Sequence, residues 1–206
     1  MANIKIAFQG EKGAYSHIAS EILFKNAEII TCSTFEETFK AAFDDESIKI
    51  IIPLENSLAG RVSDIHYLLT KYKLQIYAEY FLIVEHNLLI KQEANIKDIK
   101  YVRSHAQAIG QCQNFIKKNN LKIIISADTA GSAKDLAASK DNSIAAIASN
   151  LSAEIYKLKI LNKNIEDEKG NVTRFLIMGK SIQQPEYQKD KKFITSCIFR
   201  LKSTPS

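Results

Sequence analysis

The feature that most constrains the fold of this chain is a repeated alternation of short apolar runs with amphipathic helical segments. The first pair is an apolar run over 4–9 and a helical pattern over 15–25, in which Ile18, Ile22 and Leu23 share one face. Later apolar runs cover 27–32, 48–53, 101–103, 121–126, 143–148 and 175–178, and later helical patterns begin near 34, 63, 105, 129 and 150. Repeated units of this kind predict an α/β fold, with mostly parallel sheets and helices on both faces.

The stretch 73–90 interrupts this alternation. It is long, rich in β-branched and aromatic residues, and free of obvious breakers. We interpret it as one or two strands that leave a first lobe and enter a second. The chain therefore predicts two lobes around a cleft, the first over about 1–77 plus 171–180 and the second over about 78–165.

Composition argues against several classes of protein. Of the 206 residues, 46% are hydrophobic and 25% are charged, which is ordinary for a globular protein. No apolar run reaches the roughly 20 residues needed to span a bilayer, and the N-terminus lacks the pattern of a secretory signal. The net charge of +5 is spread along the chain instead of lying in one stripe. We therefore expect a cytoplasmic protein whose partner is neither a membrane nor a nucleic acid.

The pattern of possible ligand residues does not predict a metal site. Cys32, Cys112 and Cys197 are scattered and odd in number, as is typical of reduced thiols in a cytosol. Neither they nor the four histidines show metal-ligand spacing. The turn at 10–13 has two glycines but lacks the full spacing of a nucleotide-binding fingerprint.

Polar clusters follow several of the predicted strands, at 10–16, 55–57, 104–105 and 128–129. In open α/β sheets, ligands bind beyond the carboxyl ends of the strands. These clusters therefore predict a small-molecule site in the cleft between the lobes.

A fifth cluster, Asn-Val-Thr-Arg-Phe at 171–175, opens the last apolar run. It places the hydroxyl of Thr173 next to the permanent cation of Arg174 and the aromatic face of Phe175. A hydroxyl beside a guanidinium at the start of a strand can hold an anion and hand it a proton.

Together these segments resemble the prephenate dehydratase family, over roughly residues 4–179. The segments that carry the resemblance occur in the order of the family: Phe8 to Ser16, Pro53 to Ser57 with Gly60, Ser104-His105, Gln111-Cys112, Asp128 to Ala130, Ala145 to Ala148, and Asn171 to Phe175. The resemblance implies a fold like that of two-lobed (type II) periplasmic binding proteins. It also implies conversion of prephenate to phenylpyruvate with loss of carbon dioxide and water, and no metal or organic cofactor.

The resemblance also implies which residues act. Thr173 is expected to be catalytic, as the acid that protonates the departing hydroxyl, and Arg174 is expected to polarise it. The expected substrate-binding residues are Asn56, Ser57, Ser104, Gln111, Thr129, Phe175 and, close to them, Glu55. Neutral donors suit this substrate because they hold an anion without pinning the carboxylate that must leave.

Two alternatives stay open. A related arogenate or cyclohexadienyl dehydratase would differ only in recognising an amino group in place of the keto group of the side chain. A non-catalytic binding protein could use the same two-lobed cleft without chemistry.

The end of the chain departs from the family pattern. Residues 181–192 are interpreted as a linker, and 193–206 resemble the first strand of a truncated ACT regulatory domain. We expect no inhibition by phenylalanine through an ACT site. The apolar residues of this last stretch, Phe193, Ile194, Cys197, Ile198 and Phe199, form a predicted pairing edge, so we also expect a homodimer or a higher homo-oligomer.

Overall fold

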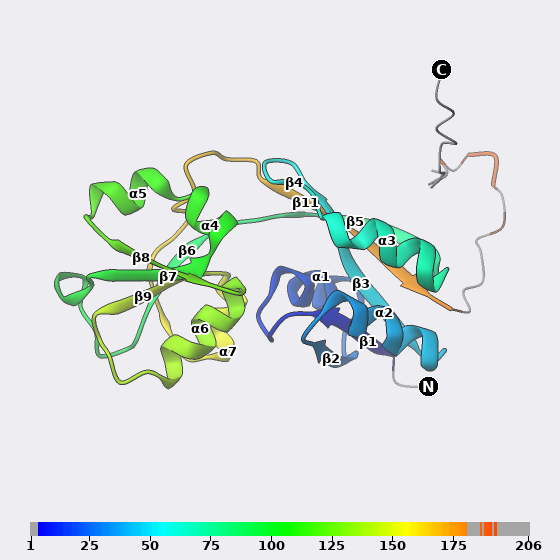
Figure 1. Cartoon of the computed structure of the whole chain (residues 1–206), viewed down its shortest axis with the longest axis horizontal. Helices are drawn as coiled ribbons and strands as arrows, with labels where there is room; N and C mark the ends of the chain where they lie inside the picture. The colour runs from blue at the N-terminus through cyan, green and yellow to red at the C-terminus, as the bar shows by residue number, and fades with distance from the viewer. Residues whose placement is uncertain (1–3, 181–185, 187, 191, 193–206) are drawn as a thin grey trace, which may run out of the picture.

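The computed structural model describes residues 4–180, 186, 188–190 and 192. The chain forms two lobes side by side, and it passes between them twice (Figure 1). The first crossing is 84–86 and the second is 163–171. The predicted strand in 193–206 and most of the predicted linker lie outside the described residues.

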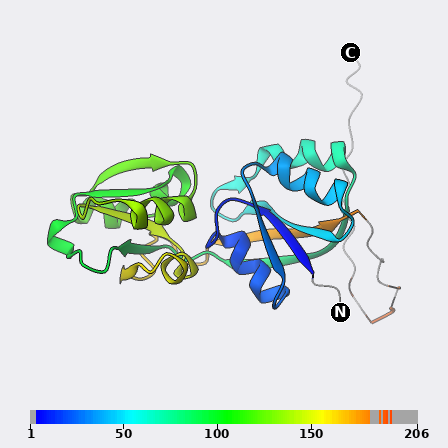
Figure 2. The same ribbon diagram turned by 90° about the horizontal axis from the view of Figure 1, so that it is seen from below.

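The first lobe is a mixed sheet in the order β2-β1-β3-β11-β5, with β4 paired to β3. Its strands are β1 (Lys5–Gln9), β2 (Glu28–Cys32), β3 (Ile48–Asn56), β4 (Gly60–Arg61), β5 (Gln75–Ile83) and β11 (Val172–Gly179). Helix α1 (Tyr15–Leu23) covers one face of the sheet, and α2 (Phe35–Asp44) and α3 (Ser63–Tyr72) cover the other (Figure 2). Both faces of the central strands are therefore buried, which explains their continuous apolar runs.

The second lobe repeats this plan with the sheet order β10-β6-β9-β7-β8. Its strands are β6 (Asn87–Ile90), β7 (Tyr101–His105), β8 (Lys122–Ser126), β9 (Ile144–Ala148) and β10 (Lys159–Asn162). Its helices are α4 (Ala106–Gly110), α5 (Gln113–Lys118), α6 (Thr129–Ala138) and α7 (Asn150–Ile155), with a 3₁₀ turn, η1 (Ile96–Asp98). One apolar cluster lies under α4 and α5, and a second lies under α6 and α7.

The predicted α/β class and two lobes are confirmed, but the sheets are mixed and not mostly parallel. Strand β11 is antiparallel to both β3 and β5, and β6 is antiparallel to both β9 and β10. The stretch 73–90 is two strands, and all of β5 stays in the first sheet. The boundary between the lobes therefore lies at 84–86 and not near 77.

The helical pattern that begins near residue 105 forms two helices instead of one. Helix α4 ends at Gly110, and α5 begins at Gln113. The carboxylate of Asp167 accepts a hydrogen bond from the backbone N of Asn114 at 3.0 Å, and its own backbone N donates to Gln111 O at 2.7 Å. The second crossing thus contacts the chain at this interruption, which lies at the edge of the cleft.

A register shift in β3 determines which side chains face the cleft. Thr173 of β11 lies opposite Asn56, and Phe175 lies opposite Pro53, so Leu54 is the extra residue of a β-bulge. Without the bulge, Pro53 and Asn56 would face opposite sides of the sheet because side chains alternate along a strand. The bulge also accommodates a proline within a central strand.

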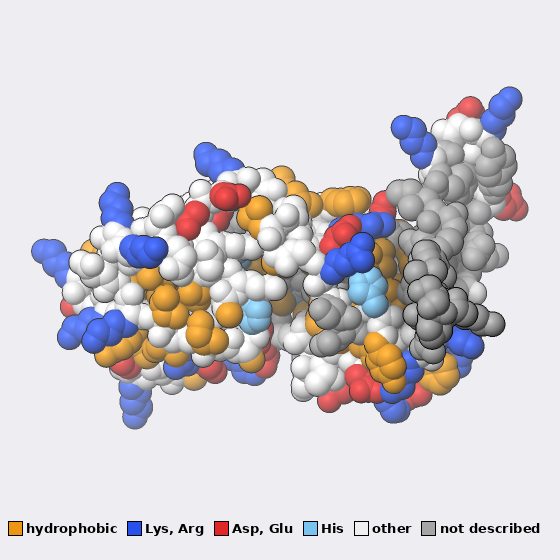
Figure 3. Space-filling model, turned by 45° about the horizontal axis from the view of Figure 1, so that its top comes forward, with side chains coloured by type: hydrophobic (Ala, Val, Ile, Leu, Met, Phe, Trp, Pro, Cys, Tyr) orange, Lys and Arg blue, Asp and Glu red, His pale blue; other side chains and the backbone are white. Residues whose placement is uncertain are grey.

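The loop before α1 joins the two lobes directly. The carbonyl of Gly13 accepts hydrogen bonds from Ser149 Oγ at 2.6 Å and Ser152 Oγ at 3.0 Å. Gly13 has φ +94°, and a Cβ on it would lie 2.8 Å from the Cα of Ser152. The surface narrows where the lobes meet (Figure 3). Among the described residues, no helix is long and apolar enough to cross a membrane.

Candidate active site

A cavity of about 590 Å³ lies between the lobes, beyond the ends of β1, β3, β7 and β8. Its lining includes the apolar side chains of Phe35, Pro53, Val62, Val84 and Phe175. The rest carries neutral hydrogen-bonding groups together with one arginine and one aspartate. A cavity of this kind can hold a small molecule that has both a hydrophobic ring and anionic groups.

Thr173 is the hydroxyl at the centre of this site. Its side chain lines the cavity and is 9% exposed. Its Oγ accepts a hydrogen bond from Asn56 Nδ2 at 2.9 Å. Since that oxygen acts as the acceptor, the hydroxyl keeps its own proton for a group in the cavity.

Backbone donors fix the orientation of Asn56. Its Oδ1 accepts hydrogen bonds from the backbone N of Leu58 at 3.1 Å and of Ala59 at 2.8 Å. The Nδ2 group therefore faces the other way and donates to Thr173 and to Asn171 Oδ1, the latter at 2.5 Å. Both hydrogens of the amide are used within the protein, so in this conformation Asn56 orients Thr173 and has no strong donor left for a substrate.

The orientation of Asn56 determines the orientation of the side-chain amides of Asn171 and Gln111. Because Asn171 Oδ1 is an acceptor, its Nδ2 must be the group that donates to Gln111 Oε1, at 2.9 Å. The Nε2 group of Gln111 then has no hydrogen-bond partner among the described residues, and Gln111 lines the cavity. Gln111 therefore has a free donor for a ligand.

His86 and Tyr15 continue the chain of hydrogen bonds. His86 Nε2 lies 2.8 Å from Gln111 Oε1, and His86 Nδ1 lies 2.8 Å from the hydroxyl of Tyr15. Burial lowers the pKa of His86, against opposing effects from Gln111 and Glu166. Burial also raises the pKa of Tyr15, so its hydroxyl stays protonated.

Arg174 and Glu55 are not where the sequence predicts them. The guanidinium of Arg174 pairs with Glu55 at 3.1 Å and with Glu79 at 2.7 Å, and neither Arg174 nor Glu55 lines the cavity. Neighbouring residues of a strand face opposite sides, so Arg174 points away from the face that carries Thr173. The side chain that contacts the hydroxyl of Thr173 is that of Asn56.

Ser104 and Ser57 are also absent from the lining of the cavity. Ser104 is fully buried, and its hydroxyl donates to Ile147 O at 2.7 Å. Strand β7 runs two residues further than predicted, so the residue that caps α4 is His105. Ser57 Oγ accepts from Val172 N at 2.9 Å and so fastens the β3 turn to β11.

Thr129 and Phe175 do line the cavity, together with Thr173, Asn56 and Gln111. The expected site residues did not include other members of the lining: Tyr15, Arg61, His86, His105, Gln107, Asp128 and Asn171. Four of these, Tyr15, His105, Asp128 and Asn171, lie inside segments that carried the resemblance. No local pattern marks His86, whose partners lie 71 and 25 residues away in the chain.

The described residues hold no group of three or more His, Cys, Asp or Glu side chains that could bind a metal ion. Arg61 is the one Lys or Arg among the described residues that line the cavity, and it has no ion pair with any of them. Its guanidinium is therefore available to a carboxylate.

A model of the prephenate dehydratase family matches residues 6–183. The chain belongs to the prephenate dehydratase family. It is 38% identical over 204 residues to the Arabidopsis thaliana protein "Arogenate dehydratase/prephenate dehydratase 2, chloroplastic". The alignment covers 99% of this chain and 53% of that protein. The chain thus spans about half the length of the curated relatives it matches, whose names include both arogenate and prephenate dehydratases.

Solved structures of similar fold include one described as a prephenate dehydratase and one described as an acylase. Prephenate dehydratase from Staphylococcus aureus is 30% identical with a TM-score of 0.75, and the match covers 88% of this chain and 68% of that one. A structure described as "GqqA- a novel type of quorum quenching acylases" is 37% identical with a TM-score of 0.80, covering 87% of this chain and 65% of that one.

Proposed function

We propose that this member of the prephenate dehydratase family converts prephenate to phenylpyruvate. The observation that carries the proposal is the hydroxyl of Thr173, which is oriented by Asn56 and keeps a free proton inside the cleft. Loss of the ring carboxylate as carbon dioxide sends an electron pair into the ring. The electrons expel the ring hydroxyl, which leaves as water once Thr173 has protonated it.

Threonine is a very weak acid, and the hydrogen bond from Asn56 makes loss of its proton easier. As Thr173 gives up its proton, negative charge develops on Oγ, which already accepts the Nδ2 hydrogen of Asn56. A donor that is in place before the reaction stabilises that charge without reorganisation. This arrangement gives the general acid the polarising neighbour that it needs.

The rest of the cavity suits the other parts of the substrate. Arg61, the free amide of Gln111 and the hydroxyl of Thr129 can hold the carboxylate of the pyruvyl side chain. Pro53 and Phe175, which are paired across β3 and β11, offer an apolar surface to the ring and to the carboxylate that leaves, because a dry environment favours loss of its charge.

Arogenate is the second candidate, since the relatives carry both names. Its ammonium group would need an acceptor where prephenate has a keto oxygen. Asp128 is the one carboxylate among the described residues of the cavity lining. Its Oδ1 already caps Gly131 N at 2.6 Å, so it contributes at most one free oxygen.

An acylase function receives less support from the site. A nucleophilic hydroxyl needs a base that removes its proton. The described partner of Thr173 Oγ is a donor, Asn56 Nδ2.

Incubation with each of the two substrates tests the proposal. We expect phenylpyruvate from prephenate, and a ratio of the two kcat/KM values that favours prephenate over arogenate. Thr173→Val keeps the shape and removes the proton, so kcat is expected to fall by at least about 10²-fold with little change in KM. Thr173→Ser is the matched control because it keeps a hydroxyl. Full activity in the valine variant would require another acid, and no product from either substrate would favour a binding protein.

A further inference from the structure

His86 lies where the two crossing segments meet. Its backbone N donates to Glu166 Oε2 at 2.9 Å, and its backbone O accepts from Ile165 N at 2.8 Å. Its side chain is 3% exposed and contacts Gln111 of the second lobe and Tyr15 of the first. The ring is thus held from both lobes, and the backbone of the residue is held by the second crossing.

The hydrogen-bond directions in the site determine where the imidazole carries its proton. Gln111 Oε1 is an acceptor because Asn171 donates to it, and the orientation of Asn171 follows from backbone N–H groups that cannot be reversed. An acceptor facing His86 Nε2 at 2.8 Å requires a hydrogen on that nitrogen. Neutral His86 is therefore the Nε2–H tautomer, and its Nδ1, which carries no hydrogen, faces the hydroxyl of Tyr15 at 2.8 Å.

We propose that His86 is a positioning residue for the dehydration: its Nε2–H holds Gln111 Oε1, so that the amide nitrogen of Gln111 is aimed at the substrate. The proposal rests on the function proposed above. Asn171 holds the same oxygen from the other side, so two donors keep the amide of Gln111 in one orientation. An amide held in this way loses little freedom when it binds an anion.

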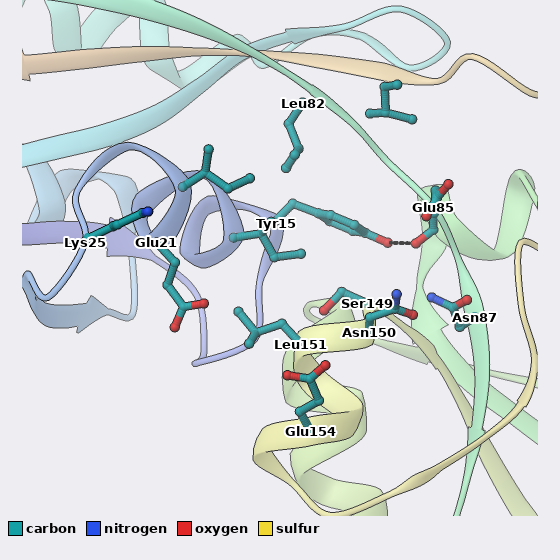
Figure 4. Close-up of a pocket in the computed structure, with 13 residues that line it drawn as sticks. Tyr15, Glu21, Lys25, Leu82, Glu85, Asn87, Ser149, Asn150, Leu151 and Glu154 are labelled. Atoms are coloured by element: carbon teal, nitrogen blue, oxygen red, sulfur yellow. Dashed lines mark hydrogen bonds between the residues drawn. The ribbon is translucent and has the colours of Figure 1, made fainter.

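Tyr15 couples this arrangement to the position of the lobes. Figure 4 shows its side chain reaching from α1 to the first crossing, where the hydroxyl meets the backbone of Glu85. The hydroxyl has one hydrogen and two acceptors in reach, Glu85 O at 2.7 Å and His86 Nδ1 at 2.8 Å. Either hydrogen bond keeps the first lobe against the segment that carries His86.

The tautomer of His86 tests the geometry without any catalysis. Nitrogen-15 NMR of the whole chain, without substrate near neutral pH, distinguishes the two neutral tautomers. A spectrum of His86→Gln identifies the His86 signals by their loss. We expect a proton on Nε2, and a predominant Nδ1–H tautomer would overturn the proposal. This result does not depend on which reaction the protein performs.

Two substitutions of His86 then test the effect on the reaction. Gln can place a donor near the position of Nε2, whereas Asn reaches only as far as Nδ1. We expect His86→Asn to raise the KM for prephenate about tenfold, as expected for a weakened charge-assisted hydrogen bond, and His86→Gln to recover most of that loss. A merely structural role would reduce the amount of active protein and leave KM unchanged. An unchanged KM in His86→Asn, or equal increases in both variants, would contradict the proposal.

Failure of the proposed function gives a different outcome. In that case the wild-type chain forms no product from prephenate or arogenate, whereas the tautomer of His86 is still measured. Thermal unfolding of both variants checks that they fold before KM is compared.

Discussion

At the scale of residues, the alternation of side chains along β11 places Thr173 and Arg174 on opposite faces of the sheet. Thr173 faces the cavity beside Asn56, whereas Arg174 is on the other face and pairs with Glu55 and Glu79. The sequence shows a hydroxyl next to a cation, but neighbours in a strand do not share a face. Adjacency in the sequence is therefore a poor guide to contact within this motif.

This separation predicts that Arg174 contributes to stability more than to catalysis. Arg174→Gln removes a partly buried ion-pair network and a cation that lies 5.9 Å from the ring of Phe81. We expect a lower midpoint in thermal unfolding, with kcat within about fivefold of wild type. The matched variant is Thr173→Val, which should show the opposite pattern. A loss of kcat in Arg174→Gln as large as that in Thr173→Val would contradict this assignment.

Gln111 offers a second prediction at this scale. Its Oε1 accepts two hydrogen bonds, so Gln111→Glu keeps both acceptor contacts and removes only the free Nε2 donor. It also adds a negative charge next to an anionic substrate. We expect a near-normal unfolding midpoint and an increase of at least about tenfold in KM, measured by initial rates against prephenate. A strong loss of stability would mean that the amide has the reverse orientation.

At the scale of elements, the existence of the strands and helices could be predicted from the sequence better than the irregularities within them. Most apolar runs and helical patterns correspond to elements of the structure, because their periodicity follows burial. The bulge at Leu54 and the interruption near Gln111 were not predicted. Both depend on partners far along the chain, β11 for the first and Asp167 for the second. These two irregularities turn Asn56 and Gln111 into the cleft.

The loop at Gly13 gives the prediction at this scale. An alanine there would have an unfavourable positive φ, and its Cβ would lie 2.8 Å from the Cα of Ser152 in the other lobe. We expect Gly13→Ala to cost about 1–3 kcal/mol of stability and to lower kcat/KM. Gly110→Ala is the control, because nothing lies within 4 Å of its added Cβ. Chemical unfolding of the two variants should show a loss only for Gly13→Ala.

At the scale of the whole molecule, two buried histidines link stability to pH. Burial lowers the pKa of both His17 and His86 below the ordinary value of 6.5. The unfolded chain therefore binds protons more readily than the folded one, so stability is fully present above pH 6.5 and is lost as the pH falls from 6.5 towards the folded pKa values. The exposed carboxylates of Asp45 and Asp141, with pKa values below 3.8, affect only a more acidic range.

Urea unfolding at a series of pH values measures this effect. We expect the free energy of unfolding to decrease steadily between pH 6.5 and 5, and to decrease less in His86→Gln. A flat profile over this range in the wild-type chain would contradict the assignment. The expected homo-oligomer and cytosolic location stay predictions at this scale.

The two crossings also have a consequence for how the molecule is made. Strand β11 lies between β3 and β5, so the sheet of the first lobe cannot be completed until the ribosome has delivered residue 179. The second lobe needs only residues 87–162 for its five strands and is available earlier. Thr173, the proposed proton donor, thus lies on the last strand of the two sheets to be synthesised, and we expect a nascent chain to gain activity only after this strand has joined the first sheet.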